Sequence, residues 1–163
     1  MLLFMTKKLQ SKSGSKIMSN ERFTLRAAVY LILIRDGKTL LSRRYKTGWM
    51  DGKYSLIAGH LDGKEKVSDS MIREAYEEAG VKVAKKDLKP VKVLHRNSGD
   101  QEYIDFFFLA EKWEGEPTVK EPNKCDNMSW FPINALPENT LPYIKDVIEN
   151  YKDGIPFIES GWD

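Results

Sequence analysis

Residues 68–79 constrain the fold of this chain more than any other segment, because they read as a helix with two unlike faces. We expect Ser68 to cap the start of the helix and Gly80 to end it. A hydroxyl satisfies free backbone N–H groups, and glycine tolerates the left-handed conformation of a C-terminal cap. At about 100° per residue, one face carries Ser68, Ile72, Ala75, Tyr76 and Ala79, and we expect it to pack inward.

Apolar, β-branched runs on both sides of this helix predict strands. They are expected at residues 27–34, 39–43, 55–58, 91–95, 102–110 and 129–131, and a final helix begins at Pro142 and ends near Tyr151. The Asp36-Gly37 pair predicts a hairpin turn between the first two strands. Residues 114–127 read as a loop. Because strands and helices interleave irregularly, the sequence favours an α+β fold, a sandwich with a mixed β-sheet.

Composition narrows the function classes. The 163 residues suit one domain, and 26 basic against 24 acidic residues give a net charge of +2. So small a surplus disfavours binding to duplex nucleic acid, and no apolar run reaches the length of a membrane span. The single cysteine, Cys125, cannot form an internal disulfide, which fits a reducing cytoplasm. With two histidines and one cysteine, a closed structural zinc site is hard to build, so we expect oxygen ligands for any metal.

The first twenty residues are expected to be a flexible extension, with the domain spanning residues 21–163. Residues 1–5 are apolar and are followed by Lys7 and Lys8. A signal peptide has the opposite order and a longer apolar stretch. Residues 10–20 are rich in serine, lysine and glycine, as flexible segments are.

The other face of the predicted helix carries Glu74, Glu77 and Glu78 within about 100° of one another. Like charges at this spacing destabilise an isolated helix. One interpretation is a solvated acidic surface. The other is a site for a divalent cation, which removes the repulsion, and oxygen ligands favour Mg²⁺ or Mn²⁺. Arg73 is four residues from Glu77 and can pair with it.

Upstream spacing favours the second interpretation. Gly59 is followed by five residues, Glu65, seven residues and then the run REAYEEAGV at residues 73–81. This pattern resembles the Nudix box, the signature of the Nudix hydrolase superfamily, although Ala75 stands where the pattern usually has a larger aliphatic residue. The resemblance implies an α/β/α sandwich in which the box forms a loop, a helix and a loop. It also implies metal-dependent hydrolysis of a nucleoside diphosphate linked to another moiety.

The same resemblance assigns candidate roles within the box. Glu74, Glu77 and Glu78 would be metal ligands, with Glu77 and Glu78 also in the catalytic set. A backbone carbonyl of Ala58 or Gly59 would add a further ligand. Arg73 would orient a glutamate, and Glu65 would be a supporting carboxylate.

Outside the box, the sequence is similar to the MutT branch of that superfamily. The run LSRR at residues 41–44 resembles its double-arginine strand end, so Arg44 would bind substrate, unless it is a plain surface arginine. WEGEP at residues 113–117, followed by Lys120 and Glu121, resembles a loop whose glutamate serves as base or metal ligand. Glu121 is therefore the candidate, with Glu116 and Glu102 as rivals.

Recognition of the base is assigned to two further side chains. Trp49 would stack on a base, although it also suits a loop anchor. Asn139 lies near the position of a purine-reading asparagine in that branch, and its amide offers both a donor and an acceptor to a purine edge, although it also suits a turn.

The expected function is Mg²⁺-dependent (or Mn²⁺-dependent) hydrolysis of a nucleoside triphosphate to a monophosphate and pyrophosphate, with an oxidised purine such as 8-oxo-dGTP as substrate. One alternative is another nucleoside diphosphate derivative, such as ADP-ribose, a nucleotide sugar or a capped RNA end. A second alternative is a nucleotide-binding Nudix module without turnover. The expected partner is a small-molecule nucleotide, and both a monomer and a homodimer stay open.

Overall fold

The computed structural model describes residues 22–162. The expected extension at residues 1–20 therefore lies outside the described residues. Strands and helices follow one another as β1 (Arg26–Arg35), β2 (Lys38–Arg44), β3 (Tyr54–Ser55), β4 (Ile57–His60), α1 (Val67–Ala79), a 3₁₀ turn (Lys85–Asp87), β5 (Lys89–Asn97), β6 (Glu102–Ala110), β7 (Cys125–Pro132), α2 (Pro142–Asn150) and β8 (Phe157–Ser160). No helix in this part of the chain is long and apolar enough to cross a membrane.

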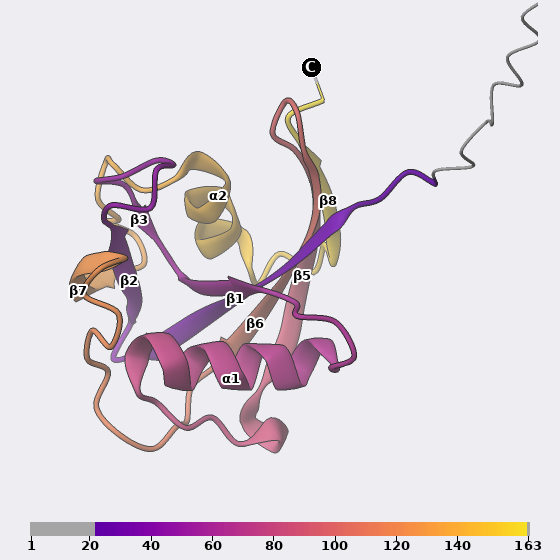
Figure 1. Cartoon of the computed structure of the whole chain (residues 1–163). Coiled ribbons are helices and arrows are strands. Elements are labelled where there is room, and N and C mark those ends of the chain that lie inside the picture. The colour runs from indigo at the N-terminus through magenta and orange to yellow at the C-terminus, as the bar shows by residue number, and fades with distance from the viewer. Residues whose placement is uncertain (1–21, 163) are drawn as a thin grey trace, which may run out of the picture.

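The strands form one mixed sheet in the order β3-β2-β1-β6-β5-β8, with β4 added to β1 and β7 added to β2. β1 pairs in parallel with β6 through residues 26–33 and antiparallel with β4 through residues 28–31, and it meets β2 only at Ile34 and Arg35. β1 therefore runs diagonally between a β2-β3-β7 group and a β6-β5-β8 group (Figure 1).

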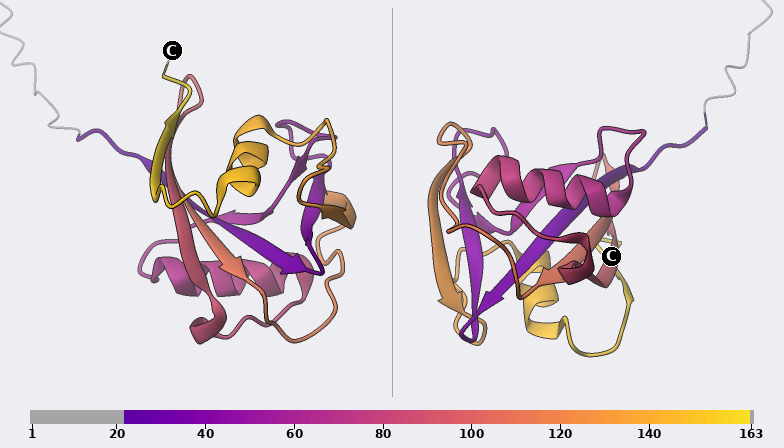
Figure 2. Two further views of the ribbon diagram at one scale, coloured as in Figure 1. Left: turned by 180° about the vertical axis from the view of Figure 1, so that it is seen from behind. Right: turned by 90° about the horizontal axis from the view of Figure 1, so that it is seen from below.

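The two helices lie on opposite sides of this sheet, and each covers a separate core (Figures 1 and 2). Phe108 lies in the core beneath α1, whereas Phe107 lies in the core beneath α2. Successive side chains of β6 thus enter opposite layers, as a strand buried on both faces requires. The predicted α+β sandwich with a mixed sheet is confirmed.

Two details of the predicted α1 are wrong. The helix begins at Val67, and Lys66 occupies the N-cap without a side-chain hydrogen bond, so Ser68 is not the cap. Tyr76 is 57% exposed, whereas the buried side chains include Met71, Ala75 and Ala79. The inward face is centred on this i, i+4 series, which turns Tyr76 toward solvent. Gly80 ends the helix in the left-handed conformation, with φ of 70°, as predicted.

Two further differences concern strands. β7 begins at Cys125, inside the segment expected to be a loop. β8 was not expected; it pairs in parallel with β5 through residues 157–160. Its four residues, two apolar and then two polar, are too few to show the alternation that predicts a strand.

Candidate active site

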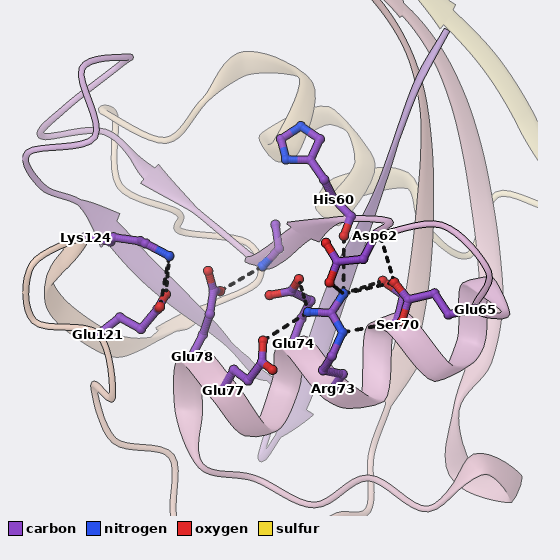
Figure 3. A network of polar contacts seen from close by, with 11 residues as sticks. His60, Asp62, Glu65, Ser70, Arg73, Glu74, Glu77, Glu78, Glu121 and Lys124 are labelled. Carbon is purple, nitrogen blue, oxygen red and sulfur yellow. Dashed lines mark hydrogen bonds and ion pairs between the residues drawn. The ribbon is translucent and has the colours of Figure 1, made fainter.

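The side chain of Glu78 is directed from α1 toward β4. Its carboxylate accepts a hydrogen bond from the backbone N–H of Ala58, at 3.0 Å (Figure 3). Burial raises the pKa of Glu78 to about 8, and the negative charges of Glu74 and Glu121 add to the shift, although the Ala58 N–H opposes it. The fold therefore keeps a carboxyl group in an environment that disfavours its charge, which is a common property of catalytic and metal-binding groups.

Arg73 connects the other carboxylates of the box. Its Nη1 donates to Glu74 at 2.7 Å and to Glu77 at 3.0 Å. Its Nη2 donates to Glu65 at 3.0 Å and to the backbone oxygen of His60 at 3.3 Å. The bond to Glu65 contributes most to raising the pKa of Arg73, and the bonds to Glu74 and Glu77 add to the shift. Arg73 is thus held by Glu65 and by the β4 end, and it fixes the position of two box glutamates (Figure 3).

Gly59 brings the backbone of β4 against the Glu74 carboxylate. A β-carbon at this position would overlap the carboxyl group of Glu74. Burial raises the pKa of Glu74, and Arg73 opposes that shift. Only glycine gives Glu74 this space, so the close approach explains why the motif requires glycine here.

The loop before β7 brings Glu121 to the same place. The backbone N–H of Lys120 donates to the carbonyl of Glu78 at 3.0 Å, which ties this loop to the end of α1. The Glu121 carboxylate binds Lys124 Nζ at 2.9 Å, and this bond raises the pKa of Lys124. The sequence did not single out Lys124, since one lysine in a charged loop carries no distinctive pattern.

The rival glutamates lie elsewhere. Glu116 forms an ion pair with Arg35 at 2.8 Å, and Glu102 lies 3.3 Å from His95. Neither lines the cavity beside α1, so the geometry favours Glu121 over both.

That cavity has a volume of about 400 Å³. Its lining combines carboxylates with cations and the β4 backbone, and the residues that matter here are Arg43, Arg44, Ala58, Gly59, Glu74, Glu78, Glu121 and Lys124. Glu77 is not part of the lining, and its side chain is 50% exposed. Of the three predicted box ligands, the structure therefore brings two to the cavity and leaves Glu77 at its outer edge, against Arg73.

The donors around this cavity suit a hard divalent cation. They are carboxylate and carbonyl oxygens, and the gap that Gly59 leaves beside Glu74 keeps one carboxylate against the backbone. Within residues 22–162, no three acidic, histidine or cysteine side chains converge closely enough to hold a metal as they stand. Arg73 and Lys124 bind Glu74 and Glu121 instead, so a cation here would compete with these two side chains.

A second cavity, of about 230 Å³, adjoins the first along β4. The two cavities share Arg44, Ser55, Ala58, Gly59 and His60. The second one is lined by four aromatic side chains, Tyr30, Trp49, Tyr103 and Tyr143, together with Arg96 and several polar residues. A carboxylate-lined space thus adjoins a space with four aromatic side chains, and the two share residues of β4.

The predicted substrate residues divide between this cavity and the loop around it. Arg44 donates to the Trp49 carbonyl at 2.8 Å and lies 4.8 Å from the centre of the Trp49 ring, so these two residues meet at the cavity. Asn139 instead donates to the carbonyl of Gly52 at 2.8 Å and lines neither cavity. Arg96 on β5 also lines the second cavity. The sequence analysis did not single it out, because one charged residue in an alternating strand is a weak signal.

Comparison with known proteins agrees with the fold and with the box. The NUDIX domain family matches residues 24–151. The chain belongs to the Nudix hydrolase family. Members of this family act on the pyrophosphate bonds of nucleotides. A crystal structure of a MutT NUDIX hydrolase from Burkholderia pseudomallei superposes on this Nudix chain with a TM-score of 0.72 and 26% identity, covering 78% of this chain and 98% of the other.

Two curated relatives bear on the substrate. The 8-oxo-dGTP diphosphatase of Escherichia coli is 29% identical over 111 residues, which cover 68% of this Nudix chain and 84% of the relative. The NAD-capped RNA hydrolase NudC of Chromobacterium violaceum is 30% identical over 112 residues, which cover 69% of this chain. The chain spans only 40% of the length of NudC, so the likeness is confined to part of that protein.

Proposed function

We propose that this protein is a Mg²⁺-dependent pyrophosphohydrolase that converts a nucleoside triphosphate to a monophosphate and pyrophosphate. The observation that carries the proposal is the pair of adjoining cavities. One is lined by carboxylates and cations and the other by aromatic rings, with Arg44 and Gly59 common to both. A nucleotide has the same division, because its phosphates are charged and its base is a planar ring.

The residues around the first cavity have matching roles. Glu74, Glu78, Glu121 and a carbonyl of Ala58 or Gly59 would hold the metal, which neutralises phosphate charge and aligns water for attack when it is bound. Arg73 positions Glu74, and Glu77 supports Arg73 from the outer edge of the cavity. Arg44 and Lys124 line the cavity and are suited to contact phosphate oxygens.

The substrate we favour is an oxidised purine triphosphate such as 8-oxo-dGTP. The E. coli 8-oxo-dGTP diphosphatase supports this choice, because the match covers 84% of that protein. The second candidate is a nucleoside diphosphate joined to a larger group, supported by the similarity to NudC. We place the activity in the cytoplasm, which the single cysteine supports.

A substrate panel tests the proposal. The intact protein with Mg²⁺ is given 8-oxo-dGTP, dGTP, dATP, ADP-ribose and NAD, and the products are separated by chromatography. We expect monophosphate and pyrophosphate from a triphosphate, with turnover lost after chelation of the metal. Turnover of ADP-ribose or NAD alone would favour the second candidate, and binding without turnover would favour a non-catalytic module.

A matched pair of variants tests the site. Glu78→Gln should lower kcat/KM about 100-fold or more, because it removes a charged group from the metal and water site. Glu111→Gln, at an exposed glutamate paired with Lys89, should leave kcat/KM unchanged. Wild-type turnover in Glu78→Gln would reject the assignment.

A further inference from the structure

Arg96, which lines the aromatic cavity, belongs to a buried ion pair that the proposed catalytic residues do not use. Arg96 on β5 donates from Nε to Asp105 on β6 at 2.7 Å, and Nη2 lies 3.4 Å from the other carboxylate oxygen. The Asp105 side chain is fully buried, and that of Arg96 is 8% exposed. Burial raises the pKa of Asp105, and the Arg96 guanidinium opposes that shift.

Two aromatic rings fix the orientation of the same guanidinium group. Its central carbon lies 4.3 Å from the centre of the Tyr103 ring and 4.6 Å from that of the Tyr143 ring. Together with the two bonds to Asp105, these contacts hold the group in one orientation. A fixed guanidinium is pre-organised to donate hydrogen bonds, because it loses little further freedom when it does so.

One end of this guanidinium group is left for a ligand. Arginine has five N–H donors, and the hydrogen bonds of Arg96 to residues 22–162 use Nε and Nη2. Nη1 has no acceptor in that part of the chain, while Arg96 itself lines the cavity of about 230 Å³. Donors in such a place normally find an acceptor, which here is water or a bound molecule.

We propose that Arg96 recognises a carbonyl oxygen of the nucleobase, so that the protein prefers bases with a 6-oxo group to bases with a 6-amino group. The claim that a nucleotide enters this cavity rests on the proposed function. Asp105 balances the charge of Arg96, which favours a neutral acceptor over a phosphate. The surrounding aromatic side chains suit a planar heterocycle.

The chemistry of the two base types gives the discrimination. A 6-oxo purine presents an oxygen acceptor to the Arg96 donors. A 6-amino purine presents N–H groups at the same position, which places donor against donor and leaves both without a partner. Arginine is the side chain that most often contacts the O6 edge of guanine in nucleic-acid complexes, for the same reason.

Equilibrium binding tests this inference independently of turnover. Calorimetry measures the affinity of the intact protein for IMP and AMP, which differ at the 6-position and are not triphosphates. We expect IMP to bind about tenfold more tightly than AMP. The double variant Arg96→Met with Asp105→Leu removes both charges together, which avoids a buried unpaired ion. In this variant the preference should fall below about twofold, mainly through weaker binding of IMP.

Two further variants complete the design. Arg96→Lys keeps the charge and lacks the planar fork, so it should also lose most of the preference, and it tests the inference even if the double variant does not fold. Arg26→Met is the control. Arg26 lies 6.0 Å from the same Tyr103 ring, is exposed and does not line the cavity. Its replacement should leave the preference intact.

The inference is overturned if the wild-type protein binds IMP and AMP equally or binds neither. It is also overturned if both Arg96 variants keep the preference, or if Arg26→Met loses it to the same extent. Failure of the proposed function has a different signature, namely no hydrolysis of any triphosphate. Turnover of triphosphates with unselective binding would therefore reject the role of Arg96 alone.

Discussion

Replacement of Glu78 by glutamine should stabilise the metal-free protein while it removes activity. The Glu78 carboxyl has a pKa of about 8 in the fold, against 4.5 for an unperturbed glutamic acid. Because the folded pKa is the higher one, the folded state holds a proton that the unfolded chain has lost. Stability therefore falls as the pH rises from about 5 to about 8, and the loss is complete above that.

The size of the effect follows from the shift. A change from 4.5 to about 8 corresponds to roughly 5 kcal/mol if all of it is expressed. The side chain is only partly buried and borders a cavity of about 400 Å³, so the ionised group keeps part of its exposure to solvent. We therefore expect the variant to exceed the wild type in free energy of unfolding by about 2 kcal/mol above pH 8. Glutamine has the same shape, and its carbonyl oxygen can accept the Ala58 N–H bond.

The assay is urea unfolding of wild type and Glu78→Gln in a chelating buffer from pH 5 to pH 9. The difference in free energy of unfolding should be small at pH 5 and should rise in favour of the variant up to pH 8. Glu77→Gln is the control, because this side chain is half exposed, and it should not produce the rise. A difference that stays flat across this range would refute the argument that Glu78 is desolvated. Added Mg²⁺ should reverse the order, since it stabilises the state that binds it.

Two other predictions concern neighbouring features. Gly59→Ala should lower kcat/KM about 30-fold with little change in the free energy of unfolding, because the alanine methyl group displaces the flexible Glu74 carboxylate. A kcat/KM near the wild-type value would contradict this. Asp153→Ala should lower the free energy of unfolding by roughly 3 kcal/mol, because it leaves the buried Lys92 ammonium group without its partner. Lys92 Nζ lies 2.9 Å from Asp153, and the Lys92 side chain is only 1% exposed. A urea midpoint close to the wild-type value would show that the pair contributes little.

Helix α1 could be predicted because its information is local. Spacings of three and four residues determine which side chains share a helix face, so the sequence alone brings Glu74 and Glu78 together. Gly80 ends the helix for an equally local reason, its left-handed backbone. The cap at Lys66 could not be predicted, because the chain enters the helix through the loop after β4, and serine at residue 68 is already inside the first turn.

Contacts between distant segments account for what spacing along the chain did not predict. Glu121 was named only through the resemblance to the MutT loop, and it reaches the cavity because the Lys120 N–H binds the end of α1. Arg96 and Asp105 meet because β5 and β6 pair with Leu94 opposite Asp105. A shift of that register by one residue would place Asp105 on the other face of the sheet. Asn139 has a suitable side chain for a purine edge, yet its bond to Gly52 uses it within a loop.

The two cavities share the β4 residues Ala58, Gly59 and His60, and this limits how the protein can change its substrate. β4 and α1 provide the wall and the carboxylates of the first cavity, whereas Arg96 and Tyr103 belong to the β5-β6 hairpin. The residues that line the first cavity and those of the hairpin are linked by the short β4 backbone at Ala58 and Gly59, which lines both cavities. Substitutions on the hairpin should therefore alter the ratio of affinities between bases and leave the proposed metal site intact. Substitutions at Gly59 should impair hydrolysis of all substrates alike, because they act on the wall that both cavities share.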